Sequence, residues 1–259
     1  MEELQTILTE VFGESSDSEG EEQKQFLHAH CAENRVTVKA QSGSVFGESH
    51  SWQSITEING LWLCKEFLSS DQQSMLLSSI HQEGWFAESS SNQAMRFGDL
   101  PGWAVELSSS IHEVILSDNY VAESENCEKG KEACIFPQDL LWREPLFDQL
   151  IVNMYQPGEG ICPHVDLMRF EDGIAIVSLE SSCVMHFSRV KSETCKAQDP
   201  QQKIPVLLTP GCLILMWGEA RYLWKHEINR KPGFQIWEGQ EIDQNRRISV
   251  TLRKLGLTD

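Results

Sequence analysis

The second half of the chain is a succession of short strand patterns, and no other feature of the sequence constrains the fold as strongly. Two helices are predicted before these strands, one capped by Ser69 or Ser70 and one over 104–116. Helices followed by many short strands favour an α+β fold, in which N-terminal helices pack on a double-stranded β-helix core of the jelly-roll or cupin-like kind. Apolar and β-branched runs, broken by Gly, Pro or polar clusters, predict strands at 147–155, 161–166, 173–179, 183–190, 204–209, 212–217, 222–228 and 246–254, with loops at 121–138, 191–203 and 229–245.

The stretch NMYQPGEGICPHVD, residues 153–166, contains the first candidate site. It predicts a strand, a Pro-Gly turn and the start of a second strand. In an extended chain, His164 and Asp166 point to one face, as do Asn153 and Tyr155. An imidazole and a carboxylate placed in this way supply two ligands of a facial triad for non-haem Fe(II). A histidine on a strand is more often structural, so the motif is informative only if a third ligand and an anion-binding group follow.

Two later histidines are candidates for the third ligand. His186 lies in CVMHFSRV, which is typical of an ordinary strand. His226 lies in ARYLWKHEI, after the apolar run LILMW and far beyond Asp166 in the sequence. A distal ligand that returns on a late strand suits a barrel, so we favour His226.

The segment RRISVTLRKL near the C-terminus provides the candidate anion-binding group. Arg247, Ser249, Thr251 and Arg253 alternate with Ile248, Val250 and Leu252, which predicts a half-buried strand with a polar face. An edge strand with solvated arginines is the alternative. A guanidinium is well suited to bind a carboxylate through two hydrogen bonds, and a buried carboxylate requires such a partner.

Together, N-x-Y, H-x-D, a distal His and R-x5-R resemble the AlkB family of Fe(II)- and 2-oxoglutarate-dependent dioxygenases. The resemblance extends from about residue 58 to 255 and includes GLWLCKEFLS at 60–69, GWF at 84–86, NQAMRFGDLPGW at 92–103 and GEARYLWKHEI at 218–228. It implies that His164, Asp166 and His226 bind iron. It also implies that O2 is the second co-substrate.

The resemblance also assigns roles in binding 2-oxoglutarate. Tyr155 and Arg247 would hold its distal carboxylate, whereas Asn153 and Arg253 would lie nearer the end that chelates the metal. Family members often have Asn where this chain has Ser249, which weakens one expected co-substrate contact and leaves the charge pair intact.

The implied reaction is oxidative N-demethylation of alkylated bases in RNA or DNA. Aromatic side chains of the N-terminal lid, among them Phe97 and Trp103, could stack a flipped base or belong to the core. Met168 and Arg169 follow Asp166 closely and are further candidates for substrate contact. A protein hydroxylase or demethylase of the same family and an inactive binding scaffold are the alternatives; the complete ligand set argues against the scaffold.

The charge distribution divides the chain into an acidic segment, 1–57, and a dioxygenase domain, 58–259. The net charge is −18, and the first segment holds 11 acidic and 3 basic residues. Such a chain lacks the basic field of proteins that bind nucleic acid non-specifically. We expect residues 1–57 to be largely disordered, with a short amphipathic helix over 1–13 that is either a docking element for a partner protein or a frayed end.

The eight cysteines are scattered without a C-x-x-C pair, which indicates reduced thiols. The HAHC motif at 28–31 has metal-binding residue types but no second half with zinc spacing. No apolar run is long enough to span a membrane, and no secretory signal is recognisable. We therefore expect no membrane association and a location in the nucleus, the cytoplasm or both.

Overall fold

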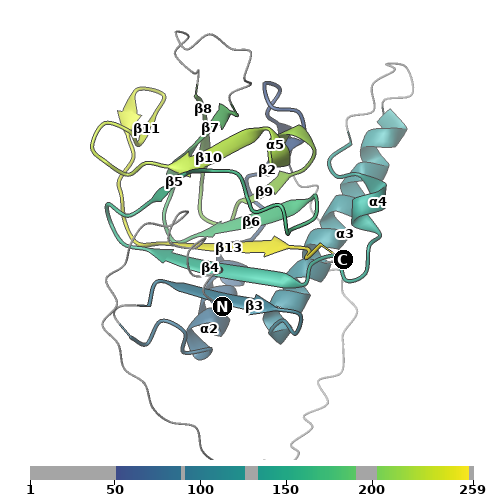
Figure 1. Cartoon of the computed structure of the whole chain (residues 1–259), viewed down its shortest axis with the longest axis horizontal. Helices are drawn as coiled ribbons and strands as arrows, with labels where there is room; N and C mark the ends of the chain where they lie inside the picture. Colours follow the sequence, from purple (N-terminus) through teal and green to yellow (C-terminus); the bar gives the residue numbers. More distant parts are fainter. Residues whose placement is uncertain (1–50, 89–90, 126–133, 191–202, 257–259) are drawn as a thin grey trace, which may run out of the picture. The chain divides into compact units, whose positions relative to one another are not determined.

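The computed structural model describes residues 51–88, 91–125, 134–190 and 203–256, without the side chains of 119–125. The expectations for the N-terminal helix, the acidic disordered stretch and the HAHC motif lie outside these residues. All strand pairs in the two main sheets are antiparallel. Two facing antiparallel sheets form the double-stranded β-helix core that the sequence predicts (Figure 1).

The larger sheet has seven strands and the smaller one has four. In spatial order, the larger sheet consists of β1 (Trp52–Ser54), β2 (Leu61–Cys64), β9 (Leu213–Met216), β6 (Ile174–Leu179), β13 (Arg247–Arg253), β4 (Gln149–Tyr155) and β3 (Gln93–Phe97). The smaller sheet consists of β5 (Ile161–His164), β10 (Trp224–Ile228), β7 (Cys183–Arg189) and β8 (Ile204–Leu208). A separate hairpin pairs β11 (Ile236–Trp237) with β12 (Gln240–Glu241).

The larger sheet separates two apolar clusters, because side chains of a strand alternate between its faces. On β9, Ile214 and Met216 join a cluster with Phe187 of β7 and other residues of the small sheet. Leu213 and Leu215 face the other way, into a cluster that contains helix residues. The core therefore has three layers: helices, the large sheet and the small sheet.

Two long helices form the outer layer of this arrangement. Helix α2 (Ser70–Gln82) begins with a capping box between Ser69 and Gln72. Helix α3 (Gly102–Glu125) follows, and both helices contribute buried residues to the cluster on the outer face of the large sheet. Two single-turn helices, α4 (Gln138–Leu141) and α5 (Glu219–Tyr222), complete the elements.

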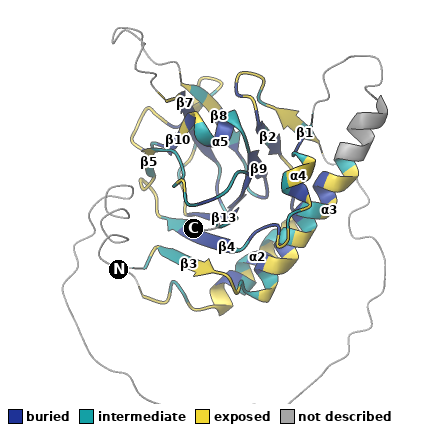
Figure 2. Cartoon of the chain, turned by 45° about the vertical axis from the view of Figure 1, so that its right-hand side comes forward, coloured by how far each residue is buried: buried dark blue, intermediate teal, exposed yellow. Residues whose placement is uncertain are grey.

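Strand β13 lies between β4 and β6, and all seven of its residues are buried (Figure 2). Ile248, Val250 and Leu252 face the helices. Arg247 and Arg253 therefore face the small sheet, as do Ser249 and Thr251. The expectation of a half-buried strand was wrong, because the polar face of β13 points into the space between two sheets and not into solvent.

Several elements differ from those expected. Helix α3 extends to Glu125, beyond the predicted end at residue 116, and residues 219–222 form α5 just before a strand that begins at Trp224. Strands β1, β2 and β3 were not predicted. Strand β1 lies before residue 58, the predicted start of the domain, and pairs with β2. Loop 229–245 contains the β11–β12 hairpin.

The structure also bears on the cysteines and on membrane association. No disulfide joins any of the cysteines in the described residues, which are Cys64, Cys134, Cys162, Cys183 and Cys212. Within the described residues, no helix has the length and apolar character needed to cross a membrane.

Candidate metal and co-substrate site

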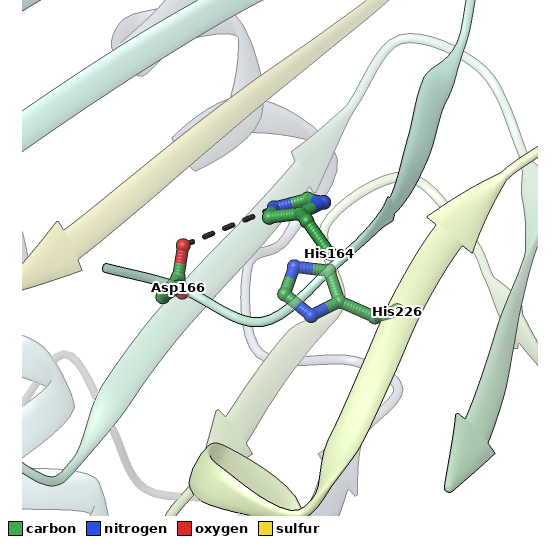
Figure 3. Close-up of side chains that lie close together, drawn as sticks. All are labelled: His164, Asp166 and His226. Atoms are coloured by element: carbon green, nitrogen blue, oxygen red, sulfur yellow. Dashed lines mark ion pairs between the residues drawn. The ribbon is translucent and has the colours of Figure 1, made fainter. Parts of the chain in front are cut away.

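Two histidines lie side by side on neighbouring strands of the small sheet. His164 on β5 is the register partner of His226 on β10, and their ring centroids are 4.2 Å apart. Asp166 lies two residues beyond the end of β5 and turns its carboxylate toward this pair (Figure 3). One ligand atom from each of the three side chains lies within 4.8 Å of the others. Because metal–ligand bonds are about 2.0–2.2 Å long, one ion can reach all three after small side-chain rotations.

A bulge in β5 directs His164 into the site. Ile161 pairs with Ile228 and His164 pairs with His226. Between these two pairs β5 contains one residue more than β10, which is a β-bulge. The extra residue lets Ile161 pack in the apolar cluster between the sheets while His164 points to His226. The observed strand β5 ends at His164, two residues before the predicted end at 166. Asp166 therefore reaches the site from a loop.

Both imidazoles are prepared for metal binding. The Nδ1 of His164 lies 2.8 Å from the carbonyl oxygen of Cys162, which can only accept a hydrogen bond. Nδ1 therefore carries a proton, and Nε2, which lies 3.9 Å from Oδ1 of Asp166, is the nitrogen that would bind a metal. Burial, followed by the neighbouring His164, lowers the pKa of His226 to about 3. His226 is therefore neutral at physiological pH and can donate its lone pair.

Asp166 is held in its ionised form by Arg253. Burial alone would raise the pKa of Asp166, but the Arg253 guanidinium and the two imidazoles lower it below its ordinary value. The Nη1 of Arg253 donates a 3.0 Å hydrogen bond to Oδ1 of Asp166, which leaves Oδ2 for a metal. Arg253 is itself fixed by a 2.6 Å hydrogen bond from Nε to Gln149.

Arg221 is a positioning residue for Asp166 that sequence reasoning did not identify. This fully buried side chain of α5 donates from Nη1 to the carbonyl of Asp166 at 2.9 Å. Its Nη2 donates to the carbonyls of Leu167 at 2.7 Å and Phe170 at 3.1 Å. Arg221 thus holds the loop that carries a candidate metal ligand. Its only signal in the sequence is its place five residues before His226.

Arg247 provides a buried positive charge at the other end of β13. It is 1% exposed, its Nε donates to Oγ of Ser178 at 3.0 Å, and its guanidinium lies 5.6 Å from the centre of the Tyr155 ring. Its Nη2 has no hydrogen-bond partner among the described residues. A buried unsatisfied guanidinium nitrogen is costly, so this position fits an incoming carboxylate.

The remaining predicted co-substrate residues line the same face. Asn153 on β4 is the register partner of Ser249 on β13 and accepts a 2.7 Å hydrogen bond from Nε2 of Gln93. Burial raises the pKa of Tyr155 to about 12, although Arg247 opposes this shift. The Tyr155 hydroxyl therefore keeps its proton and can donate a hydrogen bond to a carboxylate.

The structure brings together only some of the candidate substrate residues. The guanidinium of Arg169 lies 5.1 Å from the centre of the Phe97 ring, and Met168 beside it is 76% exposed. Trp103 does not lie with them. It belongs to the helix-side cluster, with its ring 6.1 Å from that of Trp85, because α3 begins on the outer face of the large sheet.

His186 is also outside the cluster of candidate metal ligands. It is the register partner of Glu227, and burial lowers its pKa. A cavity of about 640 Å³ lies elsewhere too, between α3 and residues 141–147. None of the candidate ligands lines this cavity, so its size is no guide to the chemistry.

The family model of the 2OG-Fe(II) oxygenase superfamily matches residues 60–253. A Xenopus tropicalis protein named tRNA (carboxymethyluridine(34)-5-O)-methyltransferase alkbh8 is 30% identical over 187 residues, which are 71% of this chain and 27% of that protein. An Arabidopsis thaliana protein named Alkylated DNA repair protein ALKBH8 homolog is 27% identical over 224 residues, 76% of this chain and 59% of that protein. The chain thus spans little more than a quarter of the first relative and less than two thirds of the second.

Two further comparisons concern shorter or more distant similarities. A mouse protein named Alpha-ketoglutarate-dependent dioxygenase alkB homolog 7, mitochondrial, is 38% identical over 101 residues, 39% of this chain and 42% of that protein. A solved structure titled The structure of OsALKBH1 superposes with a TM-score of 0.52 at 16% identity and covers 75% of this chain and 96% of that one. At this identity the match shows a shared fold, and the predicted double-stranded β-helix is confirmed.

Proposed function

The chain belongs to the 2OG-Fe(II) oxygenase superfamily, with AlkB-like relatives, and on this premise we propose that it removes N-methyl groups from bases of RNA or DNA. Membership makes it a 2-oxoglutarate-dependent dioxygenase. The substrate class, the N-demethylation and the roles of individual residues are the content of the proposal.

The described residues fit the metal and co-substrate that the family uses. Two imidazoles and one carboxylate are a donor set suited to Fe(II), with positions left open for other ligands. We assign His164, Asp166 and His226 to the metal. When bound, iron and 2-oxoglutarate supply the oxidising chemistry: with O2, the co-substrate is converted to succinate and carbon dioxide, and one oxygen atom enters a substrate C–H bond.

The protein's own side chains bind and orient the reactants in this scheme. Arg247 and the protonated Tyr155 hold the distal carboxylate of 2-oxoglutarate, by a charge pair and a hydrogen bond. Asn153 and Ser249 contribute polar contacts along its length. Arg253 keeps Asp166 ionised and oriented, so that one carboxylate oxygen always faces the metal position.

The reaction balances for an N-methylated base. Hydroxylation converts N–CH3 to N–CH2OH, consuming one O2 and one 2-oxoglutarate and producing one succinate and one carbon dioxide. The N–CH2OH group then splits into N–H and formaldehyde. No reductant is needed beyond 2-oxoglutarate.

The single observation that carries the proposal is the Nη2 of Arg247, which has no hydrogen-bond partner among the described residues. A binding scaffold gains nothing from a buried guanidinium that makes one hydrogen bond and leaves Nη2 without a partner among the described residues, since this costs folding free energy. The buried guanidinium of Arg221 also has an unpartnered nitrogen, but it donates three hydrogen bonds to carbonyls. An enzyme that captures a small dicarboxylate recovers this cost each time the co-substrate binds. The position of Arg247, on the same inward face as Arg253 and hence the Asp166 carboxylate, argues for such a use.

The choice of nucleic acid rests on the relatives. Two of them carry names that refer to tRNA and to alkylated DNA. The formal net charge of −18 opposes strong binding to phosphate backbones, so affinity must come from close contacts with the modified base. Because the negative charge does not oppose binding of a peptide, methylated peptides are the alternative substrates that a test must include.

Succinate release measures the proposed activity directly. The full chain, loaded with iron, is incubated with 2-oxoglutarate and short oligonucleotides, each carrying one N-methylated base, or with N-methylated peptides. We expect methylated oligonucleotides to stimulate succinate formation and to release one formaldehyde per succinate formed in excess of the background without substrate. His164→Ala removes a proposed ligand, and His186→Ala, outside the cluster, is its control. Stimulation by peptides alone would refute the substrate class, whereas succinate formation by His164→Ala at the wild-type rate would refute the metal site.

A further inference from the structure

We propose that the cavity between α3 and residues 141–147 is a docking groove for a basic, amphipathic segment of a partner protein. The groove lies in the helix layer, and none of the residues assigned to the metal or to 2-oxoglutarate lines it. It is therefore a second site on the domain, and docking there does not depend on the proposed function.

The two walls of this groove come from α3 and from the segment that follows α4 (Figure 1). On the first wall, Val105, Ser109 and His112 lie at helical spacing along one face of α3. The second wall carries Trp142 and Pro145. The volume of about 640 Å³ lies within the range of about 300–1,000 Å³ that is typical of ligand sites.

A large apolar side chain is exposed on each wall. Trp142 is 59% exposed and Val105 is 52% exposed, whereas Leu146 and Phe147, which also line the cavity, are buried in the helix-side core. The His112 and Trp142 rings are nearly perpendicular, with their centroids 5.3 Å apart. The indole is thus supported from one side while much of its surface remains accessible. Exposed tryptophans beside a pocket are enriched among the residues that dominate binding energy between proteins.

The rim of the groove carries negative charge that the protein does not neutralise. Asp99, Glu113 and Glu144 line the cavity and are exposed. Their carboxylates form no hydrogen bond or ion pair with any group in the described part of the chain. Helix α3 contains no Lys or Arg in its 24 residues, so it offers no cation to pair with Glu113.

Arg143 is the only Lys or Arg among the residues that line the cavity, and its guanidinium is used within the protein. Its Nε donates to the carbonyl of Leu146 at 2.9 Å, and its Nη2 donates to the carbonyl of Gly173 at 3.1 Å. The groove therefore combines an apolar centre with unpaired carboxylates. A segment in which Lys or Arg flanks apolar side chains is complementary to both features.

Charge also argues against two other occupants of the groove. The segment 1–13, MEELQTILTEVFG, is predicted to be an amphipathic helix but contains three acidic residues and no Lys or Arg. A second copy of this chain carries the same net charge of −18. Either would bring further negative charge to the rim, and like charges oppose association. The groove therefore favours a different, basic protein.

Selection from a phage-displayed library of random peptides tests the groove without a known partner. Peptides of about 15 residues can form about four helical turns. The full chain is the bait, and clones that also bind Trp142→Ser are removed. We expect the recovered peptides to be rich in Lys and Arg, with apolar side chains between them. Synthetic copies should bind the wild type at least about tenfold more tightly than Trp142→Ser, and Trp142→Phe should retain most of the affinity.

Two matched charge reversals test the complementarity. Glu113→Lys should weaken binding of the selected peptides about tenfold and reduce the salt dependence of the affinity. Asp243→Lys makes the same change in charge at an exposed position outside the groove, so the affinity should stay within about twofold of the wild-type value. Fluorescence anisotropy of labelled peptides measures the affinities, and thermal unfolding shows that each variant retains the fold.

Several results would overturn the proposal. If Glu113→Lys and Asp243→Lys bind the peptides alike, the attraction is to the overall negative charge and not to the groove. Recovery of only acidic or uncharged peptides, or of none that depends on Trp142, would refute a basic partner at this groove. Displacement of a bound peptide by a synthetic segment 1–13 would assign the groove to this chain, as would a dimer in light scattering that Trp142→Ser dissociates.

Discussion

The Arg253 guanidinium donates a 3.0 Å hydrogen bond to Asp166 while it stacks 4.0 Å from the Phe170 ring. One buried side chain thus neutralises a proposed metal ligand and packs against the loop that carries it. Six residues earlier on the same strand, Arg247 faces the same interior space with a nitrogen that has no partner in the described part of the chain. Strand β13 therefore supplies two buried cations, one satisfied within the protein and one available to a ligand.

Replacing Arg253 should weaken iron binding. In Arg253→Gln, Asp166 loses the cation that offsets its burial, so the carboxylate becomes harder to ionise and is held less firmly. Loss of such a supporting contact typically costs about 10–100-fold in metal affinity, and we expect a decrease in this range by competition with a metal chelator. Lys254→Gln is the control, because Lys254 pairs with Asp148 and contacts no ligand. Equal iron affinity in the two variants would contradict the role given to Arg253.

Adjacent arginines should differ sharply in their effect on 2-oxoglutarate. Arg247 is buried beside Tyr155, whereas Arg246 forms an ion pair with Glu180 at the surface. Truncating one partner of a buried charge pair costs about 2–5 kcal/mol, so Arg247→Ala should bind 2-oxoglutarate at least about 30-fold more weakly. Arg246→Ala should stay within about twofold, because exposed ion pairs contribute little. Calorimetric titration of the manganese-loaded protein measures both, and similar affinities would remove Arg247 from the co-substrate site.

Much of this site could be predicted from the sequence, because the residues of each strand that face the site follow a short pattern that is visible in the sequence. The alternation in β13 identified both arginines, and the layout of the chain favoured His226 over His186. Burial of the polar face was not predictable, since alternation looks the same whether that face meets water or a second sheet. Arg221 was missed because its role depends on a loop 55 residues earlier in the chain.

The missed strand β3 and the misplaced Trp103 have a similar cause. The sequence QAMRF of β3 lacks a continuous apolar pattern, and its strand conformation depends on pairing with β4. The face on which an aromatic residue lies follows from that pairing. Without the position of β3, Trp103 could not be separated from Phe97, although the two lie on opposite faces of the sheet.

Buried thiols should make stability depend on pH in the alkaline range. Burial raises the pKa of Cys212 from 9.0 to about 12. Below pH 9 the thiol is protonated in both the folded and the unfolded state; above it, only the unfolded state ionises, so stability is lost as the pH rises from 9 toward 12. At pH 10 this loss amounts to about 1 kcal/mol for one thiol.

Urea unfolding at pH 8 and pH 10 tests this dependence. Wild type should lose about 1 kcal/mol more unfolding free energy between these values than Cys212→Ala does. Cys162→Ala, which removes an exposed thiol, should lose as much as the wild type. If Cys212→Ala shows the wild-type decrease, ionisation of this thiol does not contribute to the loss of stability.

Two glycines of the turn before His164 should differ in their effect on metal binding. A Cβ on Gly160 would lie 1.9 Å from the carbonyl oxygen of Ile228, so Gly160→Ala must push β5 away from β10 beside the bulge that aims His164. Gly158 has a φ of +90° with nothing within 4 Å of a Cβ. Gly158→Ala should therefore cost about 1–2 kcal/mol of stability through backbone strain and leave the two histidines in place. We expect iron affinity to fall at least about tenfold in Gly160→Ala and to stay near the wild-type value in Gly158→Ala.

Chelator competition measures the iron affinity of the two variants, and thermal unfolding separates a loss of affinity from a loss of fold. A folded Gly160→Ala protein with wild-type iron affinity would show that the spacing of β5 and β10 does not set the metal site.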